Sequence, residues 1–147
     1  MNFINTTISL DTKESLDIID ITEKIKKFVQ ESKIKNGLVN IQSMHTTATV
    51  FVNENEPELF KDFKNHLEKL APKNGKYHHD NFDIRTVNMC KDECANGYAH
   101  CKALLLPTNI CLNIKNNEIQ LGSWQRAMFI ELDRARERKI QIQIIGA

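Results

Sequence analysis

The C-terminal segment 139–146 places the strongest constraint on the fold. Within it, Ile140, Ile142 and Ile144 alternate with Gln141 and Gln143. This period of two puts the isoleucines on one face of a strand and the glutamines on the other. One buried face and one polar face are typical of antiparallel sheets. The chain therefore has to cover the isoleucine face with a second layer.

The remaining patterns predict further strands around two helices. Ile21, Ile25, Phe28 and Val29 form a helical stripe after Asp20, and Glu23 has capping-box spacing. A second helix follows Asn55, has Pro57 in its first turn and ends before Pro72. The apolar positions of the second helix, which we expect to be buried, are Leu59, Phe60, Phe63, Leu67 and Leu70. Strands are expected over 3–12, 15–21, 37–44, 47–53, 103–114, 118–133 and 139–146, and a tight turn at Asn116–Asn117.

This order of elements indicates one α+β domain spanning residues 1–147, a small antiparallel β-sandwich with two helices. The long polar stretch 73–101 has no clear periodicity, and such loops tend to be functional. A hydrophobic share of 41% with 27% charged residues is normal for a globular protein. The segment "DRARERK" at 133–139 is basic, but its interleaved acids favour a solvated rim.

The bulk charge and the N-terminus exclude some functions and locations. The net charge of +1 argues against nucleic-acid binding, which normally needs a concentrated basic face. We find no signal-peptide pattern at the N-terminus and no apolar run near the ~20 residues that cross a bilayer. We therefore expect a cytoplasmic protein without a membrane partner. In a reducing compartment the four cysteines would be free thiols, buried as small apolar groups.

Three segments carry histidines that are candidates for a shared site. His45 begins "HTTATVFVN", in which three threonines are also simply good strand formers. "HHD" at 78–80 places two imidazoles beside a carboxylate, and only one of the two histidines is expected to reach a shared site. His100 follows the Asn96–Gly97 turn. A zinc cluster with Cys90, Cys94 and Cys101 lacks the usual spacing.

A fourth segment, "GSWQ" at 122–125, carries an aromatic and an amide side chain. Gly122 before the large Trp124 suggests a close backbone approach or a bulge, and Trp124 is a candidate core or interface anchor. Gln125, on a strand otherwise rich in apolar residues, requires a polar partner from the protein or a ligand.

Together the four segments closely resemble the YjbQ family, whose members are often described as secondary thiamine-phosphate synthases. The resemblance covers "HTTATVFVNENEP", "YHHDNFDIRT", "NGYAHCKALLLPT" and "EIQLGSWQRAMFIELD", from about His45 onward. It implies a two-sheet α+β fold, a homotrimer, and a metal- or anion-binding pocket near a subunit interface. The site residues it implies are His45, Glu54, His79, Asp80, His100, Trp124 and Gln125. Many relatives have a second histidine where this chain has Tyr98.

If these residues converge, His45, His79 and His100 would supply three nitrogens to a divalent metal with one open position. Zinc, iron or manganese suits such ligands, whereas Mg²⁺, which prefers oxygen, would suit the thiamine-type reaction. Glu54 or Asp80 would act as general base or orient a ligand.

Other side chains would bind the substrate. Gln125 and Arg85 would hold a phosphate or carboxylate, Arg85 through its planar fork. Asn96 and Trp124 complete the expected substrate-binding set.

The reaction itself is left open by the sequence. Dedicated thiamine-phosphate synthases are TIM barrels, and this chain of 147 residues is far below the ~200 residues that such a fold needs. The alternatives are a metal-dependent hydrolase or lyase acting on a small phosphorylated metabolite, and a trimeric metal- or ligand-binding protein without catalysis.

Overall fold

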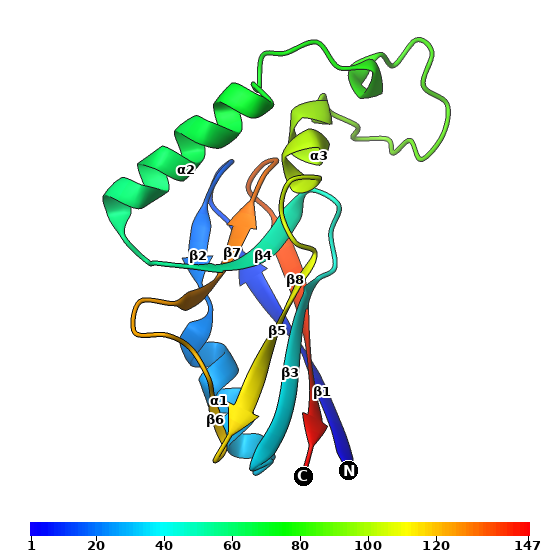
Figure 1. The fold of residues 1–147 in the computed structure, drawn as a ribbon. Helices are drawn as coiled ribbons and strands as arrows, with labels where there is room; N and C mark the ends of the chain where they lie inside the picture. Colours follow the sequence, from blue (N-terminus) through cyan, green and yellow to red (C-terminus); the bar gives the residue numbers. More distant parts are fainter.

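The computed structural model describes all residues, 1–147, as two antiparallel β-sheets with three α-helices (Figure 1). The five-stranded sheet has the order β1 (Asn2–Asp11), β8 (Glu137–Gly146), β3 (Asn36–Ser43), β5 (Asn109–Lys115) and β6 (Glu118–Ile119). The three-stranded sheet has the order β2 (Ile18–Asp20), β7 (Arg126–Glu131) and β4 (Ala48–Asn53). The helices are α1 (Thr22–Ser32), α2 (Pro57–Leu70) and α3 (Gly97–Ala103), with a short 3₁₀ helix η1 (His78–Asp80). The predicted α+β class and antiparallel sheets are confirmed.

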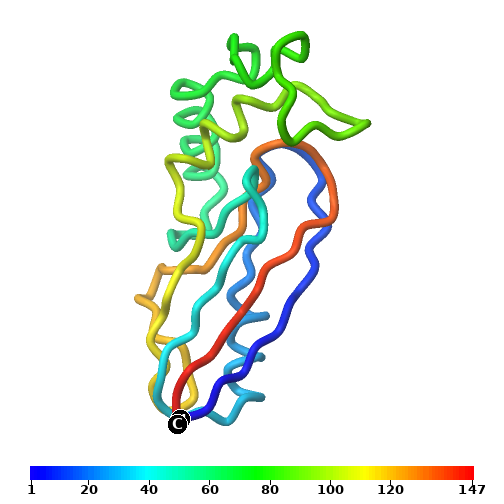
Figure 2. Tube along the Cα trace, turned by 90° about the vertical axis from the view of Figure 1, so that its right-hand side faces the viewer, coloured from blue at the N-terminus to red at the C-terminus, as the bar shows by residue number.

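The alternation in 139–146 determines how the two sheets stack. Ile140, Ile142 and Ile144 of β8 are fully buried and join the main core, while Gln141 and Gln143 are exposed. β8 lies between β1 and β3, both antiparallel to it, and Figure 2 shows these long strands side by side. The isoleucine face therefore packs against the inner sheet, and the glutamine face points outward.

The three-stranded sheet is buried on both faces, which explains why β7 is a continuous apolar run. Ala127 and Phe129 point into the core shared with the five-stranded sheet. Ile130 points the other way and packs with Leu67 of α2 and Tyr98 of α3. The order of layers is thus outer sheet, inner sheet, then α2 and α3.

Helix α1 matches its predicted apolar stripe, since Ile21, Ile25 and Val29 are fully buried in the main core. Only the Asp20 half of the predicted capping box forms, because Glu23 pairs with Lys26 and Arg126 instead of the helix N-terminus. Asp20 takes the capping role, its Oδ1 accepting a hydrogen bond from the backbone N–H of Thr22 at 2.9 Å.

Helix α2 begins at Pro57 as predicted, and the Glu56 side chain caps its first turn. Of its expected buried face only Leu67 is buried. Leu70 is 55% exposed, and Phe60 and Phe63 are half-buried. The helix therefore contacts the inner sheet along a narrow line and not over a broad apolar stripe.

Three strand predictions were too long, and one helix was missed. The expected strand 103–114 begins only at Asn109, because 97–103 forms α3 and 104–106 form a turn. The expected strand 118–133 is two strands joined by an irregular connection over 120–125. The segment 15–21 contributes only β2.

The turn prediction at Asn116–Asn117 is confirmed, since both residues have positive φ, 55° and 64°. Such φ values are required at both central positions of a type I′ hairpin turn, and asparagine tolerates them. The side chain of Asn117 also donates hydrogen bonds to the carbonyl oxygens of Val29 and Ile34, which anchors the hairpin to the end of α1. None of the three helices combines the length and the apolar character needed to cross a membrane.

Candidate functional site

A cavity of about 930 Å³ lies at one end of the sandwich, where β7 ends, β8 begins, and η1 and α3 pack above the strands (Figure 1). We call it the histidine–arginine cavity. Its polar lining is made of histidines, arginines, two acidic residues and smaller groups: His45, His78, His79, His100, Arg85, Arg134, Arg136, Arg138, Asp92, Glu93, Thr46, Thr47, Asn88, Asn96, Cys90 and Cys94. The lining therefore gathers four arginines, which are paired with carboxylates of Glu93, Glu131 and Asp133.

The most buried of these arginines, Arg138, is held by Glu131. Its side chain is 3% exposed and that of Glu131 is fully buried. Arg138 donates from Nε to Glu131 Oε2 at 2.6 Å and from Nη2 to Oε1 at 2.5 Å, a two-pronged pair. Thr12 and the backbone N–H of Asp133 donate to the same carboxylate. The carboxylate is fully satisfied, while Nη1 of Arg138 donates to no protein group.

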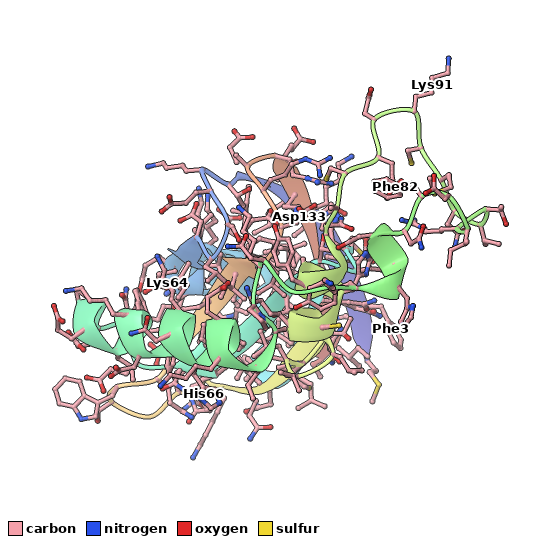
Figure 3. All side chains as sticks on the ribbon, turned by 90° about the horizontal axis from the view of Figure 1, so that it is seen from above. Phe3, Lys64, His66, Phe82, Lys91 and Asp133 are labelled. Atoms are coloured by element: carbon pink, nitrogen blue, oxygen red, sulfur yellow. The ribbon has the colours of Figure 1, made fainter.

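Asp133, which follows β7, holds the next two arginines. Its buried carboxylate pairs with Arg136 at 2.5 Å and with Arg134 at 3.3 Å. Asp133 lies near α3 in the middle of this end of the molecule, whereas Phe82 and Lys91 lie on a segment that projects beyond it (Figure 3). The arginines are therefore held in place by carboxylates behind them and present their remaining donors to the cavity.

Tyr98, at the position where the family resemblance implied a second histidine, does not line this cavity. It is buried, and its hydroxyl donates to the carbonyl oxygen of Asp133 at 3.1 Å. Burial raises the pKa of the phenol. Its ring also lies under the ammonium group of Lys102. Tyr98 thus supports the loop that carries the arginines.

His45 lies at the cavity edge with one nitrogen already engaged. The backbone N–H of Lys139 donates to its Nε2 at 2.7 Å. Burial, and next the charge of Arg138, lower the pKa of His45, which favours the neutral ring. A neutral ring that accepts at Nε2 carries its proton on Nδ1. His45 is therefore arranged as a hydrogen-bond donor toward the cavity.

His79 and His100 form a contacting pair, with ring centroids 4.5 Å apart. Nε2 of His79 is buried without a hydrogen-bond partner, which is uncommon for a polar atom. Burial, and next the charge of His79, lower the pKa of His100. No protein group donates to the His100 ring, so its neutral form offers a lone pair to the cavity. His78 also lines the cavity but is exposed.

Asp80 and Asn96 connect the histidine segment to α3. Oδ1 of Asp80 accepts from the backbone N–H groups of Asn96 and Gly97, at 2.9 and 2.8 Å. Asn96 lines the cavity and donates from its side chain to Asp133 at 3.1 Å. A Cβ on Gly97 would lie 2.5 Å from Cβ of Tyr77, so this close approach requires glycine. The position of Asp80 is that of a structural link which keeps His79 against His100.

Glu54, Trp124 and Gln125 lie at the other end of the inner sheet. β4 and β7 are antiparallel, with Asn53 opposite Arg126, so the residues just outside this pair are near each other and far from the start of β4. Glu54 is exposed, and Trp124 is 75% exposed and not part of the core. Gln125 binds the backbone N–H of Gly122 with its own side-chain oxygen. Within one chain these three residues do not join the cavity.

The predicted metal ligands share the cavity but do not form a ligand set. No group of three or more His, Cys, Asp or Glu side chains is placed to hold a metal ion. His45 does not fit such a set, because its Nε2 accepts from the backbone and its neutral ring is protonated on Nδ1. His79 and His100 retain ring nitrogens that can bind either a metal ion or a hydrogen-bonding ligand.

Two sequence interpretations are corrected here. The cysteines are not buried: Cys90, Cys101 and Cys111 are exposed and Cys94 is half-buried. The basic segment 133–139 is not merely a solvated rim, since Arg138 is buried and three of its arginines line the cavity. Arg134, Arg136 and Arg138 are two residues apart, which could have indicated one strand face, but only the partner Glu131 explains the burial. Arg85 lines the cavity as well, with its guanidinium bound to Glu93 at 3.0 Å.

Residues 6–147 match the family described as UPF0047 protein YjbQ-like. The chain belongs to this family. A UPF0047 protein of Methanothermobacter thermautotrophicus is 32% identical over 95% of this chain and 90% of its own length. YugU of Bacillus subtilis, also a UPF0047 protein, is 28% identical over 95% and 98%.

The UPF0047 fold is also present in solved structures. A crystal structure of a Clostridium acetobutylicum family member superposes with a TM-score of 0.83 at 34% identity, covering 95% of this chain and 99% of that one. A Sulfolobus solfataricus protein of unknown function gives a TM-score of 0.88 at 26% identity, covering 99% of both chains.

Replacing Glu131 should be costly because it leaves Arg138 charged, buried and unpaired. We expect Glu131→Gln to lower the free energy of unfolding by about 3–5 kcal/mol. Glu137→Gln, an exposed change at the start of β8, should alter it by less than about 0.5 kcal/mol. Urea unfolding followed by circular dichroism measures both. A loss below about 1 kcal/mol for Glu131→Gln would contradict the assigned role of the pair.

Proposed function

We propose that this UPF0047 protein binds a small phosphorylated metabolite in the histidine–arginine cavity. The observation that carries the proposal is the buried Arg138, fixed by Glu131, with Nη1 directed to no protein group, beside Arg134 and Arg136. Guanidinium groups pair well with phosphate oxygens, and fixed donors bind an anion without first losing side-chain freedom. The near-neutral net charge of the chain makes this local concentration of arginine more specific.

Phosphate and pyrophosphate are direct probes of this proposal. Arg136→Gln should weaken their binding by about tenfold, the effect of losing one charge-assisted contact. The matched control is Arg126→Gln, because Arg126 is also paired with carboxylates but lies at the far end of the inner sheet. The affinity of the Arg126→Gln variant for phosphate and pyrophosphate should stay within about twofold of wild type. Isothermal titration calorimetry at fixed ionic strength measures the dissociation constants.

The same titration tests the expected divalent metal. If the arginines alone hold the anion, the affinity should be unchanged after treatment with a chelator. If it is lost with the chelator and returns with zinc, the bound anion is held through a metal and the arginine proposal fails. Mg²⁺ is added in a separate titration, because it binds phosphate oxygens more readily than histidine nitrogens.

If the bound metabolite is also a substrate, His100 is the general base of the proposed reaction. Its lowered pKa keeps it neutral near pH 7, its ring has no protein partner, and it lines the cavity beside His79. The hydrolase or lyase alternative needs such a base to activate water or remove a proton. The thiamine-phosphate reaction is narrower: a thiazole nitrogen displaces pyrophosphate from a pyrimidine, so cationic groups that bind the leaving group matter most.

The two reactions therefore respond differently to the same pair of variants. In a hydrolase, His100→Gln should lower phosphate release from phosphomonoesters by about 10²-fold or more, the usual contribution of a positioned base. In a thiamine-phosphate synthase, Arg136→Gln should lower product formation from the pyrimidine diphosphate and thiazole phosphate more than His100→Gln does. Phosphate binding without turnover of either substrate would leave the non-catalytic binding function.

We also propose a homotrimer, as the family resemblance implies. The outer face of the five-stranded sheet supports it: three cross-strand rows on that face contain no charged side chain. The rows are Thr7–Gln141–Gln42–Asn109, Asn5–Gln143–Asn40–Cys111 and Phe3–Ile145–Leu38–Asn113. No helix covers this face (Figures 1 and 2). Depletion of charge is typical of the centre of an interface.

In such an assembly, Glu54, Trp124 and Gln125 of one copy would lie beside the histidine–arginine cavity of a neighbouring copy. Light scattering during size-exclusion chromatography should give about three times the 17.0 kDa chain mass. Gln143→Lys, which places a charge in the middle row, should reduce that mass toward a single chain. A monomeric wild type would contradict the trimer.

A further inference from the structure

One wall of the histidine–arginine cavity is a long connection, residues 81–95, between η1 and α3. Its members that line the cavity include Arg85, Asn88, Cys90, Glu93 and Cys94. The segment is held together internally around Arg85, which donates to Glu93 at 3.0 Å and to the carbonyl oxygen of Asn88 at 2.9 Å. Glu93 in turn accepts from the backbone N–H of Cys90 at 3.0 Å. The wall is thus a unit with its own network.

Two hydrogen bonds join this connection to the loop between β7 and β8, and one of them is made by Asn96, which donates from its side chain to Asp133. Apart from contacts to the adjoining η1, every hydrogen bond of 81–95 stays within the segment, except that the guanidinium of Arg134 donates to Sγ of Cys94. Arg134 lies in the loop between β7 and β8, beside Arg136 and Asp133. A change at the sulfur of Cys94 therefore acts at one of the two points that attach this wall to the β-sheet framework, and at the one made by residues 81–95.

The surroundings of Cys94 are those of a reactive thiol. Reactive cysteines are partly exposed and lie in electropositive sites, because the thiolate is the nucleophile. Cys94 is half-buried, contacts Arg134 and faces a cavity with four arginines. Cys101 and Cys111 are more exposed, yet no guanidinium contacts either of them.

A second thiol lies close to Cys94 along the chain. Cys90 is exposed and lines the same cavity, and the chain turns at Lys91–Asp92 between the two cysteines. The backbone N–H of Cys90 donates to the side chain of Glu93, the residue before Cys94, so the turn holds Cys90 beside the neighbour of Cys94. The two sulfurs are thus an attacking and a resolving thiol in one short segment.

We propose that Cys94 and Cys90 are an oxidative modification site, converted to a disulfide by a hydroperoxide. The Cys94 thiolate attacks one peroxide oxygen; an S–O bond forms, the O–O bond breaks, and hydroxide leaves. Sulfur is oxidised to a sulfenic acid and the peroxide is reduced. Cys90 then attacks that sulfur; an S–S bond forms, the S–O bond breaks, and hydroxide leaves with the Cys90 proton as water. In total, two thiols and one peroxide give one disulfide and two waters when hydrogen peroxide is used.

Disulfide formation would take the Cys94 sulfur away from Arg134 and loosen the cavity wall, leaving Asn96 as its remaining hydrogen bond to the β7–β8 loop. This part of the proposal rests on the proposed anion-binding function. Its expected consequence is an affinity for inorganic phosphate about tenfold weaker in the oxidised protein than in the reduced one, reversed by a dithiol reductant. The disulfide itself does not depend on any ligand.

The experiment treats the full chain with hydrogen peroxide and maps the products by mass spectrometry of peptides. In wild type the expected product is a Cys90–Cys94 disulfide. In Cys90→Ser, Cys94 should be trapped as a sulfenic acid by dimedone. Arg134→Gln should slow oxidation of Cys94 by about tenfold, while Cys101→Ser and Cys111→Ser should leave its rate unchanged.

Two results would overturn the assignment. Oxidation of Cys101 or Cys111 as fast as that of Cys94 would show that exposure alone sets the rate. The second result has two parts: Cys94 is oxidised equally fast in wild type and in Cys90→Ser, and wild type forms no Cys90–Cys94 disulfide. This result would show that Cys90 is not the resolving thiol. If the disulfide forms and phosphate affinity does not change, the loosening of the wall is wrong and the modification site stands. If neither redox form binds phosphate, the proposed function fails and the mapped disulfide is unaffected.

Discussion

The buried pair of Glu131 and Arg138 is the interaction on which this end of the molecule depends. Glu131 ends β7 on the face that points at the outer sheet, and Arg138 lies near the start of β8 in that sheet. A charge buried on either strand alone would be strongly unfavourable, so each residue is tolerated only because the other is opposite it. The pair therefore links the two sheets at the point where the apolar core gives way to the cavity.

The polar groups of the cavity are arranged in order around this pair. Thr12 and the backbone N–H of Asp133 complete the coordination of Glu131, and Asp133 then holds Arg134 and Arg136. Each arginine has a carboxylate partner, which offsets its charge and fixes its position while its remaining N–H groups stay available to the cavity. Opposite these arginines, Asp80 fixes the short helix that carries His79 to α3, which carries His100. The arginines and the histidine pair are thus built on different elements that line the same cavity.

This arrangement makes the segment 81–95 important for whatever the cavity binds. The arginines on the β7–β8 loop are fixed by buried carboxylates, whereas the opposite wall is attached to them through Arg134 and Cys94. One side of the cavity is rigid because it belongs to the core. The other side is held to that loop by two polar contacts, from Asn96 and from Cys94, and the second involves a sulfur atom, the side-chain atom most easily changed by oxidation.

Local patterns in the sequence determined the strands with a clear period and the turns with a clear residue preference. The Ile/Gln alternation of 139–146 predicted a strand with one buried face, and two adjacent asparagines predicted the hairpin turn, because each depends on neighbours in the chain. The same reasoning brought His45, His79 and His100 forward as candidates. It missed α3, whose seven residues are too short for a helical period to be evident, and it extended one strand through 120–125.

Only the tertiary structure decided which candidates meet. The direction of β4 against β7 places Glu54, Trp124 and Gln125 at the opposite end of the inner sheet from the histidines. The alternation of β8 places Arg138 on the face of the buried isoleucines, but it does not show how a charge could be buried there, because the carboxylate that makes burial possible lies across a strand connection and in another sheet. The sequence by itself determined which faces of the strands are apolar. The tertiary structure determined where opposite charges come together, since their energy depends on distances in space and not on spacing along the chain.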